Sequence, residues 1–122
     1  MAQILIVDDS GTVRNEVSDF LKKNGLDVAT AVDGRDGLVK LKSDSNIKLV
    51  VTDVNMPNMD GLTMAEKIRS ELGNKTVNII MLTTESSLIM KERGKAAGVK
   101  GWIVKPFNGP GVLATFKKLV GA

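Results

Sequence analysis

The sequence contains no cysteine, no histidine and no tyrosine, and each absence removes a class of function. Without cysteine there is no disulfide and no thiolate metal site. Without histidine the chain lacks the commonest general base and metal ligand, so any phosphohistidine must belong to a partner. Because these groups are missing, the chemistry falls to carboxylates, hydroxyls and amines.

Aromatic residues make up only 3% of the chain, too few for platforms on which nucleic-acid bases stack. The 17 Lys and Arg outnumber the 14 Asp and Glu, but the basic residues are scattered and form only short pairs such as Lys22-Lys23 and Lys117-Lys118. No apolar stretch approaches the ~18 residues of a membrane span. The N-terminus shows no signal peptide. We therefore expect a cytoplasmic protein with no nucleic-acid partner and no membrane partner.

Strand-like and helix-like segments alternate five times along the 122 residues, which suit one domain. The predicted strands are residues 3–7, 27–31, 48–52, 78–82 and 101–104. The predicted helices include residues 13–21, with Asn24-Gly25 as the stop, and residues 33–42, 62–72, 89–97 and 108–120, with Asp33 and Asn108 as N-caps. Strands that are continuously apolar are buried on both faces. This pattern predicts a doubly wound α/β domain, in which a parallel sheet has helices on each side.

Polar residues follow four of the predicted strands at the point where each strand ends. Asp8 and Asp9 follow the first strand, Asp53 the third, Thr83 the fourth and Lys105 the fifth. Because the carboxyl ends of parallel strands meet at one edge of a sheet, we expect these side chains to lie close together. Three carboxylates predict a hard-cation site. The hydroxyl and the ammonium beside it predict a pocket for a phosphate-sized anion.

Each of these residues also has a purely structural alternative. Asp9 or Ser10 could cap the first helix, although a cap uses only one acid. Asp53 is followed by Pro57, which disfavours a helix just before it, so Asp53 is left as a ligand or a nucleophile. Lys105 could be an ordinary exposed lysine, and Trp102 could be a packing residue rather than part of an interface.

Taken together, the motifs resemble the receiver domain of two-component response regulators. They are Asp8-Asp9-Ser10, Asp53, Met56-Pro57-Asn58-Met59-Asp60-Gly61, Thr83 and Lys105-Pro106-Phe107. The resemblance covers the whole chain and is strongest to stand-alone chemotaxis regulators of the CheY type. It implies a flavodoxin-like sheet of five parallel strands in the order 2-1-3-4-5 with five helices. It also implies that residues 1–122 are a single receiver domain with no effector domain.

By this resemblance Asp53 is the phosphoacceptor. Asp8, Asp9, Asp53 and the backbone carbonyl of Asn55 are then the ligands of Mg²⁺. Thr83 binds the phosphoryl group and reports its arrival, and Lys105 pairs with it.

The resemblance also assigns residues around this centre. Asn55 and Glu85 match positions that tune dephosphorylation. Thr83 and Trp102 match switch positions, and because indole is larger than the more usual phenol or phenyl ring, we expect the inward swing of Trp102 to be hindered. Thr84 stands where the family often has a small residue, so we expect it to narrow the access of phosphate.

The implied function is that of a phosphorylatable regulator, not an enzyme, which assists only its own phosphorylation and dephosphorylation. A histidine kinase of the chemoreceptor array is the implied phosphodonor. The implied output is binding to the flagellar motor switch, through a face on the fourth helix, fifth strand and fifth helix that includes Trp102, Lys117 and Lys118. A phosphatase is a further implied partner.

Three alternatives stay open on the sequence. A phosphorelay intermediate or phosphate sink would use the same chemistry. An aspartate-nucleophile phosphatase of the haloacid dehalogenase type would place Asp-x-Asp after the first strand, whereas here Asp8 and Asp9 are adjacent. A flavodoxin-like cofactor binder would need a Ser/Thr/Gly-rich phosphate loop in place of these two acids, which would repel a flavin phosphate.

Overall fold

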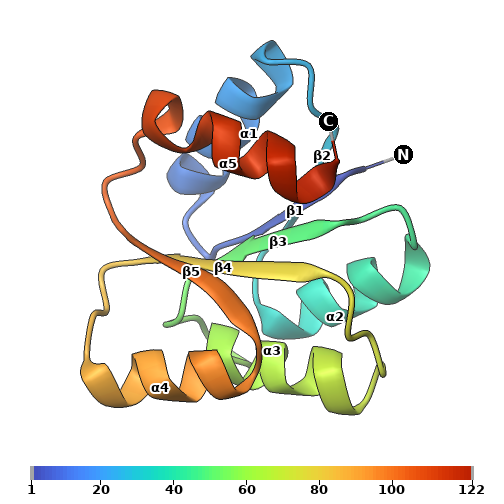
Figure 1. Cartoon of the computed structure of the whole chain (residues 1–122), viewed down its shortest axis with the longest axis vertical. Helices are drawn as coiled ribbons and strands as arrows, with labels where there is room; N and C mark the ends of the chain where they lie inside the picture. Colours follow the sequence, from blue (N-terminus) through green and yellow to red (C-terminus); the bar gives the residue numbers. More distant parts are fainter. Residues whose placement is uncertain (1, 122) are drawn as a thin grey trace.

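The structure is a computed structural model that describes residues 2–121. Five strands form one parallel sheet in the order β2-β1-β3-β4-β5 (Figure 1). They are β1 (Ile4–Val7), β2 (Val28–Ala31), β3 (Leu49–Thr52), β4 (Asn78–Thr83) and β5 (Val99–Val104). The helices between and after them are α1 (Gly11–Lys23), α2 (Gly34–Ser43), α3 (Gly61–Ser70), α4 (Leu88–Ala96) and α5 (Gly109–Val120). The predicted fold class and strand order are confirmed.

Helices cover both faces of the sheet: α1 and α5 lie on one face, and α2, α3 and α4 on the other (Figure 1). Successive residues of the central strands point to opposite faces, so each strand feeds two cores. Leu5 and Val7 of β1 pack in the core under α2 and α3. Ile4 and Ile6 pack in the core under α1 and α5, with Phe116. The sheet is therefore rigidly held at its centre, where the site residues emerge.

The edge strand β5 differs from the expectation that every strand is buried on both faces. It begins at Val99, two residues before the predicted start, and Val104 is 51% exposed. The reason is its position. β5 pairs only with β4, and α4 buries only Gly94. The apolar run from Trp102 onward resembles a central strand in sequence, although it lies at the border of the sheet.

Every helix begins after a side chain that accepts a hydrogen bond from the backbone N–H three residues on. These N-caps are Ser10, Asp33, Asp60, Ser87 and Asn108. Asp33 and Asn108 were the predicted caps and are confirmed. Ser10, not Asp9, caps α1 through the N–H of Val13. The carboxylate of Asp9 is therefore left exposed and without a capping role.

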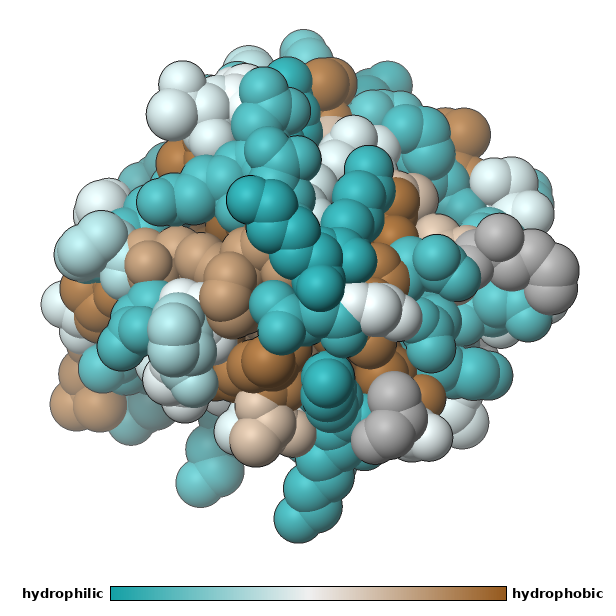
Figure 2. Space-filling view, turned by 90° about the horizontal axis from the view of Figure 1, so that it is seen from above, coloured by the Kyte–Doolittle hydropathy of each residue, from teal (hydrophilic) through white to brown (hydrophobic). Residues whose placement is uncertain are grey.

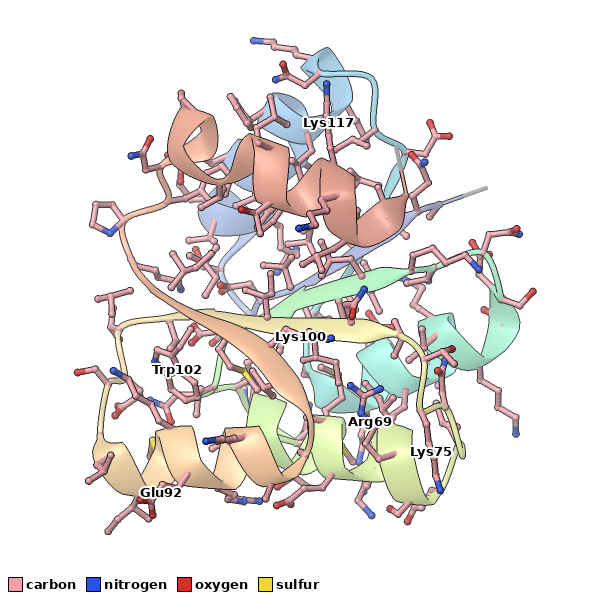
Figure 3. All side chains as sticks on the ribbon, in the orientation of Figure 1. Arg69, Lys75, Glu92, Lys100, Trp102 and Lys117 are labelled. Carbon is pink, nitrogen blue, oxygen red and sulfur yellow. The ribbon has the colours of Figure 1, made fainter. Side chains whose placement is uncertain are left out.

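Helix α4 is held by polar contacts from α3 more than by apolar burial. Arg93 of α4 forms a bidentate ion pair with Glu66 of α3, with both N–O distances at 2.8 Å. Arg69 of α3 donates to the carbonyls of Ala97 and Gly98, just past the end of α4, over 3.0 and 3.3 Å. Figure 3 shows Arg69 near this end of α4 and Trp102 toward the other end. The last turn of α4 is thus fixed to α3.

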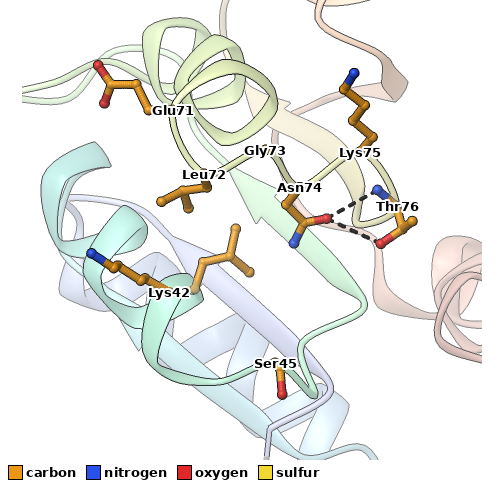
Figure 4. Close-up of a pocket in the computed structure, with 9 residues that line it drawn as sticks. Lys42, Ser45, Glu71, Leu72, Gly73, Asn74, Lys75 and Thr76 are labelled. Atoms are coloured by element: carbon orange, nitrogen blue, oxygen red, sulfur yellow. Dashed lines mark hydrogen bonds between the residues drawn. The ribbon is translucent and has the colours of Figure 1, made fainter.

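Away from the edge of the sheet where the acids lie, the surface carries few other candidate binding sites. Over α1 and α5, hydrophilic side chains dominate, with apolar atoms showing between them (Figure 2). A hollow of about 640 Å³ opens between the ends of α2 and α3 and the loop before β4 (Figure 4). It lies at the amino ends of the strands, and no predicted site residue lines it.

Within residues 2–121 no helix combines the length and apolar character needed to cross a membrane.

Candidate functional site

Three carboxylates meet at the carboxyl edge of the sheet. Asp8 follows β1 and Asp53 follows β3, and the preceding residues Val7 and Thr52 are partners in the β1–β3 register. One carboxylate oxygen from each of Asp8, Asp9 and Asp53 lies within 4.8 Å of the others. The structure therefore brings together the three acids that the strand ends predict, at a separation that one divalent cation can bridge.

Lys105 lies between two of these carboxylates. Its Nζ is 2.9 Å from Oδ2 of Asp8 and 2.9 Å from Oδ2 of Asp53. The lysine reaches this position because it directly follows β5, where its backbone N–H donates to the carbonyl of Thr83 over 2.9 Å. The peptide bond from Lys105 to Pro106 is cis. Lys105 is thus paired at the site and is not the ordinary exposed lysine of the structural alternative.

Burial sets the electrostatics of this cluster. It raises the pKa of Asp8 despite the Ser10 N–H, which donates to Oδ1 over 2.9 Å, and despite the neighbouring ammonium. Burial alone would lower the pKa of Lys105, but the hydrogen bonds to Asp53 and Asp8 raise it. When all four groups are ionised, three negative charges face one positive charge. The excess of two matches a divalent ion, and an all-oxygen donor set suits Mg²⁺.

The backbone around Asp53 is held closely, and only a small part of its side chain reaches the solvent. The N–H of Val54 donates to Oδ1 over 2.7 Å, and the Thr52 hydroxyl donates to the Asp53 carbonyl over 2.8 Å. A Cβ at Gly61 would lie 2.0 Å from that carbonyl oxygen, so the start of α3 can approach it only as glycine. The Asp53 side chain is 12% exposed. Asp60 caps α3, and Asp53 caps no helix, which is what the argument from Pro57 predicted for Asp53.

Glu85 connects the residues that surround the acids. Its N–H donates to the hydroxyl of the fully buried Thr83 over 3.2 Å. Its carboxylate accepts from Asn55 Nδ2 over 2.7 Å, and its carbonyl accepts from Trp102 Nε1 over 2.6 Å. The half-buried indole also packs toward α4, since a Cβ at Gly94 would lie 3.2 Å from its Cζ3. A single residue thus contacts Thr83, Asn55 and Trp102.

An open hollow of about 350 Å³ reaches Lys105 from the solvent. The exposed Thr84 lies in its wall, together with Val13, Glu16 and Phe107. Thr84 therefore lies in the wall of a hollow that also contacts Lys105.

Sequence reasoning missed two residues beside the site. Arg14 of α1 donates to the Asp8 carbonyl over 2.7 Å and fixes the turn after β1. Asn58 donates to Asp33 over 2.7 Å and joins the loop after Asp53 to the start of α2. The position of Arg14, one turn after Ser10, was an available signal for the first contact. No local signal marks the second, because its two residues are far apart in sequence.

A parallel sheet of order 2-1-3-4-5 that gathers acids, a hydroxyl and a lysine at its carboxyl edge defines a flavodoxin-like domain of the receiver class. The family model described as the response regulator receiver domain matches residues 4–117. The chain belongs to this family, whose members act as signalling modules of two-component systems.

Within the family the chain is similar to chemotaxis regulators. Chemotaxis protein CheY1 of Helicobacter pylori is 40% identical over 107 residues, which are 87% of this chain and 86% of that protein. The structure of Vibrio cholerae chemotaxis protein CheY4 is 42% identical, covers 98% of both chains and superposes with a TM-score of 0.88. CheY of Borrelia burgdorferi, solved in a complex with CheX, BeF3 and Mg²⁺, is 29% identical with a TM-score of 0.87, covering 96% of this chain and 87% of that one.

Proposed function

We propose that this protein accepts a phosphoryl group from a histidine kinase onto Asp53, in the presence of Mg²⁺, and passes on the signal by binding another protein in chemotaxis. The observation that carries the proposal is the position of Lys105, whose ammonium lies 2.9 Å from both Asp8 and Asp53 while Asp9 completes the acidic cluster. The similarity to CheY proteins supports the chemotaxis setting.

The residue types give the chemistry. A carboxylate oxygen of Asp53 attacks phosphorus, the P–N bond to the kinase imidazole breaks, and an acyl phosphate forms. Such a transfer depends on charge compensation more than on a general base. Lys105 supplies one positive charge, and the Thr83 hydroxyl donates its own hydrogen to a phosphoryl oxygen. Asp8, Asp9, Asp53 and the Asn55 carbonyl would hold Mg²⁺, which would supply the rest of the positive charge.

Hydrolysis of the acyl phosphate ends the signal. Water adds at phosphorus, and the Asp53 carboxylate leaves with the electron pair of the P–O bond. Asn55 and Glu85, which are hydrogen-bonded to each other over 2.7 Å, are proposed to set the rate of this step. The protein thereby assists its own dephosphorylation.

Acetyl phosphate provides the direct test of the proposal, because it replaces the kinase with a small donor. Incubation with acetyl phosphate and Mg²⁺ should add one phosphoryl mass to the intact protein, measured by mass spectrometry. Chelation of Mg²⁺ should prevent the addition. A protein that gains no mass under these conditions would contradict the proposed function.

Mg²⁺ should also stabilise the fold, because it offsets the repulsion among the clustered carboxylates. A ligand at ten times its Kd adds about 1.4 kcal/mol to the free energy of unfolding. We expect the urea midpoint of the wild type to rise accordingly with MgCl₂, and that of Asp9→Asn to rise much less. Asp19→Asn, an exposed acid on α1, is the matched control and should respond like the wild type. Equal responses of all three proteins would argue against an ion at Asp9.

The path from the site to the output face runs through Glu85. A phosphoryl oxygen that accepts from the Thr83 hydroxyl would draw that hydroxyl toward the acids and lengthen the 3.2 Å bond that it accepts from the Glu85 N–H. The Glu85 carbonyl in turn accepts from the Trp102 indole. We therefore expect the fluorescence of Trp102, the single tryptophan, to change on adding beryllofluoride and Mg²⁺. Thr83→Ala should remove the change. An unaltered emission spectrum in the wild type would show that Trp102 is not coupled to the site.

The output face is proposed to be α4, β5 and α5. A groove of about 360 Å³ between β5 and α5 is lined by Trp102, Ile103 and Phe116, with Lys100 at its border. Lys118 on α5 is exposed, and Leu88 and Ile89 at the start of α4 are 71% and 80% exposed. This mixture of apolar and basic groups suits a protein partner such as the flagellar motor switch. A phosphatase of the CheX kind is a further proposed partner.

A further inference from the structure

Asn58 adopts a backbone conformation that residues other than glycine rarely take. Its φ is 67°, and among residues 2–121 no other non-glycine residue has a positive φ. Such a conformation persists only where surrounding contacts hold it. The contact here is a hydrogen bond of 2.7 Å from Asn58 Nδ2 to Oδ2 of Asp33. Asp33 precedes β3 in the sequence, whereas Asn58 follows it.

Asp33 is a firm anchor for this contact. It is only 7% exposed, and its other carboxylate oxygen accepts from the N–H of Asp36 over 2.9 Å at the start of α2. The hydrogen bonds from Asp36 and Asn58 lower the pKa of Asp33, so it stays ionised. A second bond lies alongside, where Gly34 N–H donates to the Met59 carbonyl over 3.0 Å. The tip of the loop after Asp53 is thus fixed to the start of α2.

The loop between Asp53 and α3 has two fixed points. Its base is closed by the N–H of Gly61, which donates to the Val54 carbonyl over 2.8 Å. Its tip is the contact of Asn58 and Met59 with α2. Asn55 lies between these points, and its side chain reaches only Glu85, on another loop. The two fixed points therefore limit the backbone conformations that are open to Asn55 between them.

We propose that the hydrogen bond between Asn58 and Asp33 positions the Asn55 carbonyl toward the divalent ion, so that Asn58 is a positioning residue for Mg²⁺ binding. This inference rests on the proposed Mg²⁺ site. Asn58 does not contact the ion and acts through the loop. Its loss should weaken the affinity for Mg²⁺ but leave the reaction of Asp53 unchanged once Mg²⁺ is saturating.

Isothermal titration of MgCl₂ into a set of variants tests this inference. Asn58→Gly permits the positive φ but lacks the side-chain donor, and its Kd for Mg²⁺ should be weaker by about tenfold, as for other contacts that orient a metal ligand. Asn58→Asp places a second carboxylate beside that of Asp33, so the two repel each other and this variant should also bind Mg²⁺ weakly. The double variant Asp33→Asn with Asn58→Asp reverses donor and acceptor, keeps a side chain that can cap α2, and should restore tight binding.

The outcomes separate this inference from the proposed function. If the wild type binds Mg²⁺ and Asn58→Gly binds it equally well, the positioning role is wrong while the site stands. If the wild type binds no Mg²⁺, the proposed function itself fails. A phosphorylation rate of Asn58→Gly with acetyl phosphate that stays low at saturating Mg²⁺ would also overturn the inference, because the defect would then lie at Asp53. Urea unfolding of each variant identifies any that do not fold.

Discussion

Asp53→Asn is expected to remove phosphoryl incorporation altogether, with no mass added by acetyl phosphate and Mg²⁺ under conditions that modify the wild type fully. An amide oxygen is a poor nucleophile and cannot form the acyl phosphate. The substitution keeps the shape of the side chain, so its carbonyl oxygen can still accept from the Val54 N–H that now lies 2.7 Å from Oδ1. Folding should therefore be retained, which urea unfolding checks.

Asp19→Asn is the matched control for this experiment, since Asp19 is an exposed acid of α1 outside the cluster. It should be modified like the wild type. A phosphoryl mass on Asp53→Asn would mean that another carboxylate accepts the group, and peptide mapping would then locate it. Without such a result, the loss assigns the acyl phosphate to Asp53.

Lys105→Met is expected to lower both stability and reactivity. The ammonium makes two charge-assisted bonds of 2.9 Å, and its removal leaves Oδ2 of Asp8 and Oδ2 of Asp53 without this partner. Each such bond contributes about 1.5–3 kcal/mol, and because the lysine side chain is 18% exposed we take the lower figure. In Mg²⁺-free buffer the two bonds together should then lower the free energy of unfolding by about 3 kcal/mol, measured with urea.

The pH dependence of this loss follows from the direction of the pKa shift. The pKa of Lys105 is raised above its ordinary value of 10.5, so the ammonium stabilises the fold below that value and the stabilisation is lost as pH rises through the raised pKa. The deficit of Lys105→Met should therefore be constant across neutral pH. Mg²⁺ should recover part of this loss of stability, while phosphorylation of Lys105→Met stays slow.

Lys23→Met, on the exposed end of α1, is the control and should match the wild type in stability and in phosphorylation.

The sequence was sufficient to predict which residues would meet, because apolar runs mark the strands and parallel strands align their ends. Asp8 and Asp53 follow such runs directly, and the structure places them side by side. Lys105 follows a shorter run at the border of the sheet, and its position was also predicted. The sequence could not indicate that Lys105 pairs equally with both acids. This pairing depends on how far the carboxyl ends of β1, β3 and β5 extend relative to one another.

Contacts between loops were the other part that the sequence could not predict. Glu85 uses its N–H, its carboxylate and its carbonyl for three different partners, and only one of these groups is a side chain. The bond from Asn58 to Asp33 joins residues 25 positions apart, neither of which belongs to an apolar pattern. Such contacts depend on how two turns pack after the sheet has formed, which periodicity does not encode.

The anchoring of α4 by Arg69 has a consequence for where the domain opens first. The Arg69 guanidinium donates to the two carbonyls beyond the last turn of α4. At the first turn the only side-chain cap is the Ser87 hydroxyl, and Leu88 and Ile89 are exposed to solvent. Fraying of α4 should begin at Leu88, so amide hydrogens there should exchange with solvent faster than those near Ala96. The helix therefore has a tethered end and a loose end, and the loose end is the one that follows Glu85.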